Sequence, residues 1–127
     1  MPFGGFGLTF LSDDIVKISK FTSIDEGSIN GEQMLNQSEL SEALFRDPTS
    51  PPLATTIDRK YYANSMWGKS IELTSNCEVI IPFMSGYGGI QFVMMPNDII
   101  YYYVSDNDEF YWDGTAIELN KLNPYCN

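Results

Sequence analysis

The chain has 127 residues, which fits one folded domain, and its 43% hydrophobic and 19% charged residues are a balance typical of globular proteins. Seventeen acidic residues against seven basic ones give a formal net charge of −10, which repels nucleic-acid phosphates and anionic lipid, and no stretch approaches the roughly 20 apolar residues of a membrane helix. We therefore expect neither nucleic acid nor a membrane as a partner. Histidine is absent, which excludes Ser/His/Asp triads, Cys/His dyads and histidine-bearing metal sites, and we expect no metal and no cofactor.

The first part of the chain is predicted to be helical. Residues 1–10 carry no charge and include three glycines, so we expect no secretory signal there. Ser12, as an N-cap, precedes two acidic residues and a mostly apolar face, which predicts a helix at about 13–22. A polar turn with two glycines follows at 25–31, and Ser38 is the expected N-cap of a second helix.

The second part is predicted to be an antiparallel sheet closed by a helix. Three prolines in 48–60 end the helical part, about 1–47, and make this segment the expected linker. Apolar and aromatic runs predict the strands and a final helix, at 61–73, 78–83, 90–95, 99–104 and, for the helix, 115–122. The strand runs are nearly continuous, so we expect helices to cover the sheet on both faces in an α+β fold.

Three glycines stand within four residues between two of these strands. The stretch reads Ser85-Gly86-Tyr87-Gly88-Gly89. Glycine weakens a strand, and its usual reasons are a bulge or the close approach of a ligand or another backbone. This stretch is therefore the candidate binding site, with an ordinary glycine-rich hairpin turn as the alternative.

Cys77 and Cys126 are the only cysteines. They are too few for a structural zinc site and too far apart for a Cys-x-x-Cys redox pair. A disulfide between them would close a loop of about 50 residues and constrain the unfolded chain by roughly 4 kcal/mol. Two unpaired thiols are the equally weighted alternative.

Several short segments occur in an order typical of one enzyme family. A glycine-rich start leads into an acidic-capped helix, a Gly-x-x-x-Gly loop, a helix opened by serine, the glycine strand and an aromatic C-terminal part. The matching segments are 5–8, 12–17, 27–35, 38–40, 83–89, 95–97, 100–103, 105–106 and 110–112. Together they resemble the β-lactamase-related serine hydrolases, the family of β-lactamases and penicillin-binding transpeptidases.

The resemblance implies that residues 1–127 are a single partial domain, the C-terminal portion of a β-lactamase/transpeptidase-like fold. The complete protein would hydrolyse an acyl ester, amide or peptide substrate through an acyl-serine. Proteins of this family are often periplasmic or secreted, whereas the residues of this chain do not indicate a compartment. The partner implied for this chain is a missing N-terminal portion or a second copy of itself.

The family acts through three motifs, of which this chain carries one counterpart. The first, Ser-x-x-Lys, is absent, because the residues three positions before the five lysines are Asp14, Lys17, Ile57, Met66 and Glu118. No residue here is therefore expected to be catalytic, and this chain alone is expected to be inactive. Tyr62 and Asn64 spell the second motif, Tyr-x-Asn, but lie too close to Ser85 for the family's order, so we interpret them as structural.

The third motif, Lys/His-Thr/Ser-Gly, has its counterpart in the glycine stretch. In the family this strand offers backbone groups to the acyl substrate, which implies that Ser85 to Gly89 bind substrate. Met84 takes the place of the basic residue, which implies an esterase or peptidase-like parent. The alternative function is a free-standing, non-catalytic module that uses the Ser85–Gly89 strand as a ligand or peptide edge.

Overall fold

Helices and two antiparallel sheets make up the part of the chain that the computed structural model describes, residues 11–57, 59–86, 90–104 and 111–126. The helices are α1 Ser12–Ser19, the π-helical turn η1 Lys20–Ile24, α2 Gln37–Ala43 and α3 Asp113–Asn120. The strands are β1 Ser28–Ile29, β2 Glu32–Gln33, β3 Leu53–Ala54, β4 Lys60–Ala63, β5 Met66–Thr74, β6 Cys77–Gly86, β7 Ile90–Met94 and β8 Ile100–Val104. The predicted α+β class is confirmed, and no helix in these ranges is long and apolar enough to span a membrane.

The main sheet has six strands in chain order, β3-β4-β5-β6-β7-β8, and every neighbouring pair is antiparallel. Each strand thus pairs with the next one along the chain, as short turns permit. The apolar runs predicted β6, β7 and β8 to within three residues at either end. The expected linker 48–60 contains an edge strand, because Leu53 pairs with Tyr62 and Ala54 with Tyr61.

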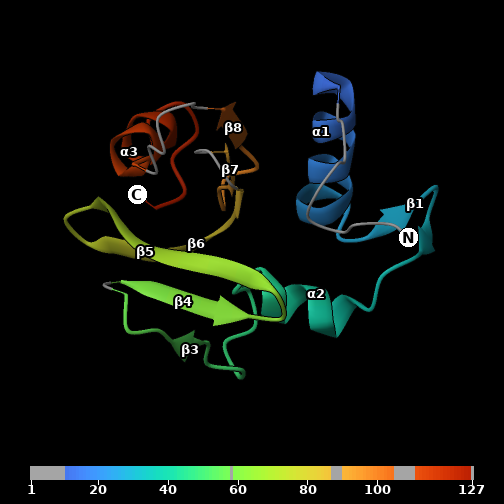
Figure 1. Ribbon diagram of the computed structural model, residues 1–127, viewed down its shortest axis with the longest axis horizontal. Helices are drawn as coiled ribbons and strands as arrows, with labels where there is room; N and C mark the ends of the chain where they lie inside the picture. The colour runs from blue at the N-terminus through green and yellow to red at the C-terminus, as the bar shows by residue number, and fades with distance from the viewer. Residues whose placement is uncertain (1–10, 58, 87–89, 105–110, 127) are drawn as a thin grey trace.

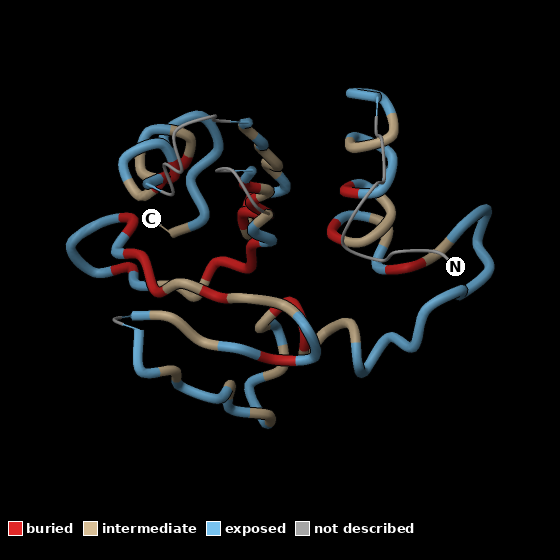
Figure 2. The backbone as a smooth tube through the Cα atoms, in the orientation of Figure 1, coloured by how far each residue is buried: buried red, intermediate tan, exposed pale blue. Residues whose placement is uncertain are grey.

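Helices cover both faces of this sheet. In Figure 1, β7 and β8 lie between α3 on one side and α1 on the other. Below α3 the ring of Trp112 contacts Phe83 with centroids 5.4 Å apart, and Figure 2 shows buried backbone gathered along the central strands. The core under α3 consists of Ile71, Leu73, Cys77, Ile81, Phe83, Val93, Met95, Trp112 and Ala116. This double cover explains why the strand sequences are apolar almost throughout.

The opposite face is packed by the N-terminal helical part. A Cβ atom placed on Gly68 would come within 2.6 Å of the Phe45 ring and 2.7 Å of Ile80, so the missing side chain makes room for that ring. Further along the sheet, Thr22 of η1 donates a hydrogen bond to the sulfur of buried Met94, 3.8 Å away.

The two helix starts differ from the sequence expectation. Leu11, not Ser12, is the N-cap of α1, and its N–H donates to the Asp14 carboxylate at 3.1 Å. Asn36, not Ser38, caps α2, because its Oδ1 accepts from the Ser38 N–H at 3.0 Å and the Glu39 N–H at 3.2 Å. Both Asn and Ser are good caps, and the sequence offers them two residues apart.

A small hairpin occupies the region predicted as a polar turn. Strands β1 and β2 are joined by Asn30 and Gly31, whose φ angles of 52° and 82° suit a type I′ turn. Asn and Gly tolerate this left-handed backbone better than other residues.

The C-terminal tail is tied to the sheet by a disulfide. Cys77, the first residue of β6, is bonded to Cys126, with Cα atoms 6.0 Å apart. Helix α3 lies between them in sequence and begins two residues before the expected start at 115.

Gly68→Ala should lower the free energy of unfolding by about 1–3 kcal/mol, since the new methyl group displaces the Phe45 ring. Urea denaturation followed by circular dichroism measures the change. Gly114→Ala is the matched control, because nothing lies within 4 Å of a Cβ there, and it should leave stability unchanged or slightly higher. Equal effects of the two substitutions would contradict the packing described for Gly68.

Reduction of the disulfide should destabilise the fold by about 4 kcal/mol in the chain-entropy model, given the sequence separation of 49 residues. Thermal melts with and without a thiol reductant measure this. The double variant Cys77→Ser/Cys126→Ser should melt at the reduced protein's temperature and ignore the reductant. A melting temperature that is the same in both states of the native sequence would show that the crosslink contributes nothing.

Candidate functional site

Ser85 and Gly86, two of the five predicted site residues, are the last residues of β6. Ser85 pairs with Gln91 and Gly86 with Ile90, so these residues stand where β6 turns toward β7. Tyr87, Gly88 and Gly89, the other three, lie outside the described residues. A Cβ on Gly86 would come 3.2 Å from Cβ of Ile90, so close cross-strand packing is one reason for glycine here.

Ser85 lines a cavity of about 800 Å³ on the sheet face that α3 covers. The register sets this orientation, because Ser85 shares a face with Phe83, two residues earlier, and Phe83 packs on Trp112. Tyr111, which precedes α3 and is 91% exposed, also lines the cavity, whereas Trp112 is buried. The cavity therefore has an aromatic wall on the helix side and a polar end at Ser85.

Gln91 is the buried polar residue at that end. Its Nε2 donates to Oγ of Ser85 at 2.8 Å, while its Oε1 has no hydrogen-bond partner, although the residue is only 1% exposed. Buried side-chain amides are ordinarily bonded at both ends. Gln91 was not predicted from the sequence, although it is a polar residue inside the apolar run 90–95 on the strand that follows Ser85.

Three basic residues line the same cavity: Arg59, Lys60 and Lys69. Lys60 and Lys69 are cross-strand partners on β4 and β5. The Lys69 ammonium, with its side chain 15% exposed, forms an ion pair with Asp113 at the start of α3 and lies 5.5 Å from the Trp112 ring centre. The Lys60 ammonium lies 5.9 Å from the Phe83 ring centre.

Arg59 is held by a carboxylate on β6 that does not line the cavity. Its guanidinium lies 3.2 Å from Glu78 on β6. The Ser70 hydroxyl, which donates to the same carboxylate, is the main cause that lowers the pKa of Glu78, and Arg59 adds to it. Glu78 is therefore ionised at neutral pH and neutralises Arg59.

Tyr62 and Asn64 do not line this cavity. The Tyr62 ring packs edge-on against Trp67, with centroids 5.1 Å apart. Asn64 turns the chain between β4 and β5 with a φ of 42°, and its side chain donates to the Glu39 carboxylate at 3.0 Å. Their contacts are those of structural residues, as expected from the sequence.

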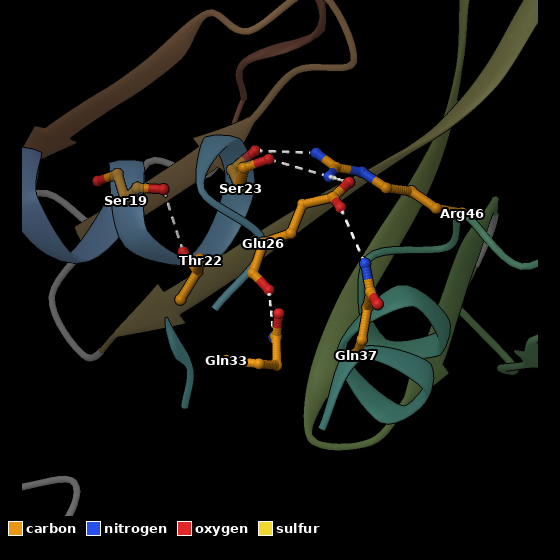
Figure 3. Close-up of polar contacts among 7 residues, drawn as sticks. All are labelled: Ser19, Thr22, Ser23, Glu26, Gln33, Gln37 and Arg46. Carbon is orange, nitrogen blue, oxygen red and sulfur yellow. Dashed lines mark hydrogen bonds and ion pairs between the residues drawn. The ribbon is translucent and has the colours of Figure 1, made fainter. Parts of the chain in front are cut away.

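A second polar cluster joins η1 to α2, as Figure 3 shows. Arg46 donates to the Ser23 carbonyl at 2.9 Å and to its hydroxyl at 3.0 Å, and lies 3.5 Å from the Glu26 carboxylate. Gln37 donates to Glu26 at 3.3 Å. Because these groups satisfy one another, we interpret the cluster as a tie between helices and not as a binding site.

The chemistry open to the cavity follows from these contacts. Across the described ranges, no group of three His, Cys, Asp or Glu side chains is placed to hold a metal ion. Ser85 bonds to a neutral amide and, within the same ranges, to no general base, so no described residue activates it as a nucleophile. The cavity offers a small molecule three kinds of contact: one ammonium group, the free oxygen of one amide and an aromatic wall.

Protein-family models, curated proteins and solved structures yield no match to this chain. The assignment of function therefore depends on the geometry above and on the resemblance of its motifs.

Ser85→Ala should lower the free energy of unfolding by about 1–3 kcal/mol, because it leaves the Gln91 amide unpaired at both ends. In a Gln91→Leu background the same change should cost nearly nothing, since no buried amide remains. Urea denaturation of the four proteins forms a double-mutant cycle. A cost for Ser85→Ala that is equal in both backgrounds would contradict the coupling.

Proposed function

We propose that this chain is the C-terminal part of a β-lactamase-related serine hydrolase, whose complete form hydrolyses acyl esters or amides through an acyl-serine. In this proposal the end of β6 at Ser85 and Gly86 is one wall of the acyl site. The observation that carries it is the position of this glycine-bearing strand end, beside a cavity in a sheet covered by helices on both faces.

The architecture supports this proposal. A transpeptidase-like fold needs an antiparallel sheet with its C-terminal helix on one face and a helical part on the other. Here α3 packs under the Phe83 side of the sheet, and the helical segments of residues 12–45 lie on the Gly68 side. The motif order along the chain is compatible with the same fold.

Glycine at the end of the strand has a chemical use in this proposal. A substrate that runs beside the strand approaches its backbone most closely where no Cβ intervenes. Backbone N–H groups of such a strand can then stabilise the oxyanion of an acyl-transfer step. Met84, which is 38% exposed, replaces the basic residue of the family motif, and this favours an ester or peptide substrate over a β-lactam.

The nucleophile would lie outside these 127 residues. No Ser-x-x-Lys occurs in the chain, and the Ser85 hydroxyl is bonded to Gln91. The chain therefore supplies substrate-binding groups, while the acyl-serine and its activating lysine come from the missing portion.

A free-standing binding module is the second candidate function. The free amide end of Gln91 favours it, because this group lines a cavity built wholly from residues of this chain. Size-exclusion chromatography with light scattering separates the candidates. A compact monomer with a cooperative melt favours the module, and self-association through unpaired sheet edges favours the partial fold.

The chain alone should not hydrolyse nitrocefin or p-nitrophenyl acetate above the buffer rate. Its intact mass should show no acyl adduct after incubation with either compound. Ser85→Ala should behave identically. Turnover that disappears in Ser85→Ala would make Ser85 the nucleophile and overturn this division of roles.

The positive test uses the gene sequence upstream of Met1. An in-frame extension carrying Ser-x-x-Lys should give a product that hydrolyses p-nitrophenyl esters, and Gly86→Val should reduce its kcat/KM by about a hundredfold. Gly114→Ala, in open space on α3, is the matched control. An extension without the motif, or an extended product that a fluorophosphonate does not label, would refute the proposed function.

A further inference from the structure

Positive charge gathers at one cavity of a strongly acidic chain. The chain has only seven basic residues against seventeen acidic ones, yet Arg59, Lys60 and Lys69 all line the cavity beside Ser85. Such a concentration is opposite in sign to the protein as a whole. An anion is therefore attracted to this cavity more strongly than to the acidic remainder of the surface.

Among the described residues, two of these three charges have a carboxylate partner and one does not. Lys69 is paired with Asp113, and Arg59 lies 3.2 Å from Glu78. Lys60, which is half-buried, has no carboxylate partner in the described part of the chain and lies over the Phe83 ring. A half-buried ammonium group without a counter-ion is costly, so an anion bound at Lys60 would complete its environment.

The amide of Gln91 is a second, independent sign of a ligand. It lines the same cavity, is 1% exposed, and has one end without a hydrogen-bond partner. That end is Oε1, an acceptor, so a hydroxyl or N–H group on a bound molecule would satisfy it. The cavity thus has an unpaired charge and an unpaired buried amide in one lining.

The remaining walls are apolar and aromatic. Phe83 and Trp112 contact each other edge-on, and Tyr111 and Ile57 are the other apolar or aromatic residues of the lining. Asp113, the partner of Lys69, adds one carboxylate to it. A volume of about 800 Å³ accommodates a small organic molecule. A single free cation beside aromatic walls suits one carboxylate on a flat apolar body, whereas a phosphate dianion would want more donors.

We propose that this cavity binds a small organic carboxylate with an aromatic or aliphatic body, and that Lys60 is its counter-ion. The carboxylate pairs with the Lys60 ammonium and the apolar body packs against Phe83 and Trp112, while a hydroxyl or N–H group on a larger ligand would donate to the free Gln91 Oε1. Every residue involved belongs to this chain, so binding does not require the hydrolase proposal to hold.

The test compares phenylacetate with phenylacetamide, its neutral analogue, on the full chain. Phenylacetate has no donor for the Gln91 Oε1, so this comparison tests the pairing of its carboxylate with Lys60. Titrations are followed by the fluorescence of the two tryptophans, Trp67 and Trp112, of which Trp112 lines the cavity, and are repeated by calorimetry. Phenylacetate should bind saturably, at least about tenfold more tightly than phenylacetamide, and its affinity should fall as salt is added. No saturable binding at millimolar phenylacetate, or equal affinity for the two compounds, would overturn the proposal.

Substitutions then locate the counter-ion. Lys60→Gln should weaken phenylacetate binding about tenfold, and Lys60→Arg should keep it within about threefold. Lys17→Gln on α1 removes the same charge from an exposed position and should leave binding unchanged. Each variant's cooperative melt is checked first. Equal affinities of folded Lys60→Gln and Lys17→Gln would remove Lys60 from the site.

The two proposals fail separately. Binding is measured on this chain, which the hydrolase proposal expects to be inactive, whereas turnover is measured on the extended product. Phenylacetate binding with no acylation of the extended product refutes the hydrolase alone. Acylation of the extended product with no phenylacetate binding refutes the carboxylate site alone.

Discussion

The register between β6 and β7 determines what the rest of this structure can do. It places Ser85 opposite Gln91 and Phe83 opposite Val93, with all four side chains on the face that α3 covers. A slip of one residue would send the whole set to the opposite face. The aromatic contact between Phe83 and Trp112 then seats α3, and the space left beyond that contact is the cavity. Core packing and the candidate site therefore depend on the same pairing.

The sequence predicts the elements of this fold well because their signals are local. Apolar runs mark β6, β7 and β8, and proline and polar residues mark the turns between them. The cap of α2 was predicted at Ser38 and lies at Asn36, because both residues are able to cap and only the three-dimensional positions of the N–H groups choose between them. The hairpin of β1 and β2 was read as a turn because its strands have two residues each.

Only part of the candidate site can be predicted from the sequence, because its residues come from several strands. Glycines draw attention to Ser85 and Gly86, which do lie beside a cavity. Lys60, Lys69 and Gln91 come from three other strands, and their meeting depends on pairings between residues that are distant in the chain. No sequence motif with fixed spacing predicts that these three side chains line one cavity. A lysine in a strand is ordinarily a solvated side chain, so its unpaired state is visible only when its neighbours are known.

The disulfide gives the chain a covalent topology that the strand order alone lacks. Together with the backbone from Cys77 to Cys126, it closes a ring that holds β6, β7, β8 and α3, while α1, α2 and strands β3 to β5 lie on the open arm. Ser85, Gln91, Trp112 and Asp113 are on the ring, whereas Arg59, Lys60 and Lys69 are on the arm. The aromatic and amide groups of the cavity would stay linked after a single backbone cut inside the ring. Its three cations are held to them by strand pairing and by two ion pairs, so separation of the arm would strip the cavity of its positive charge.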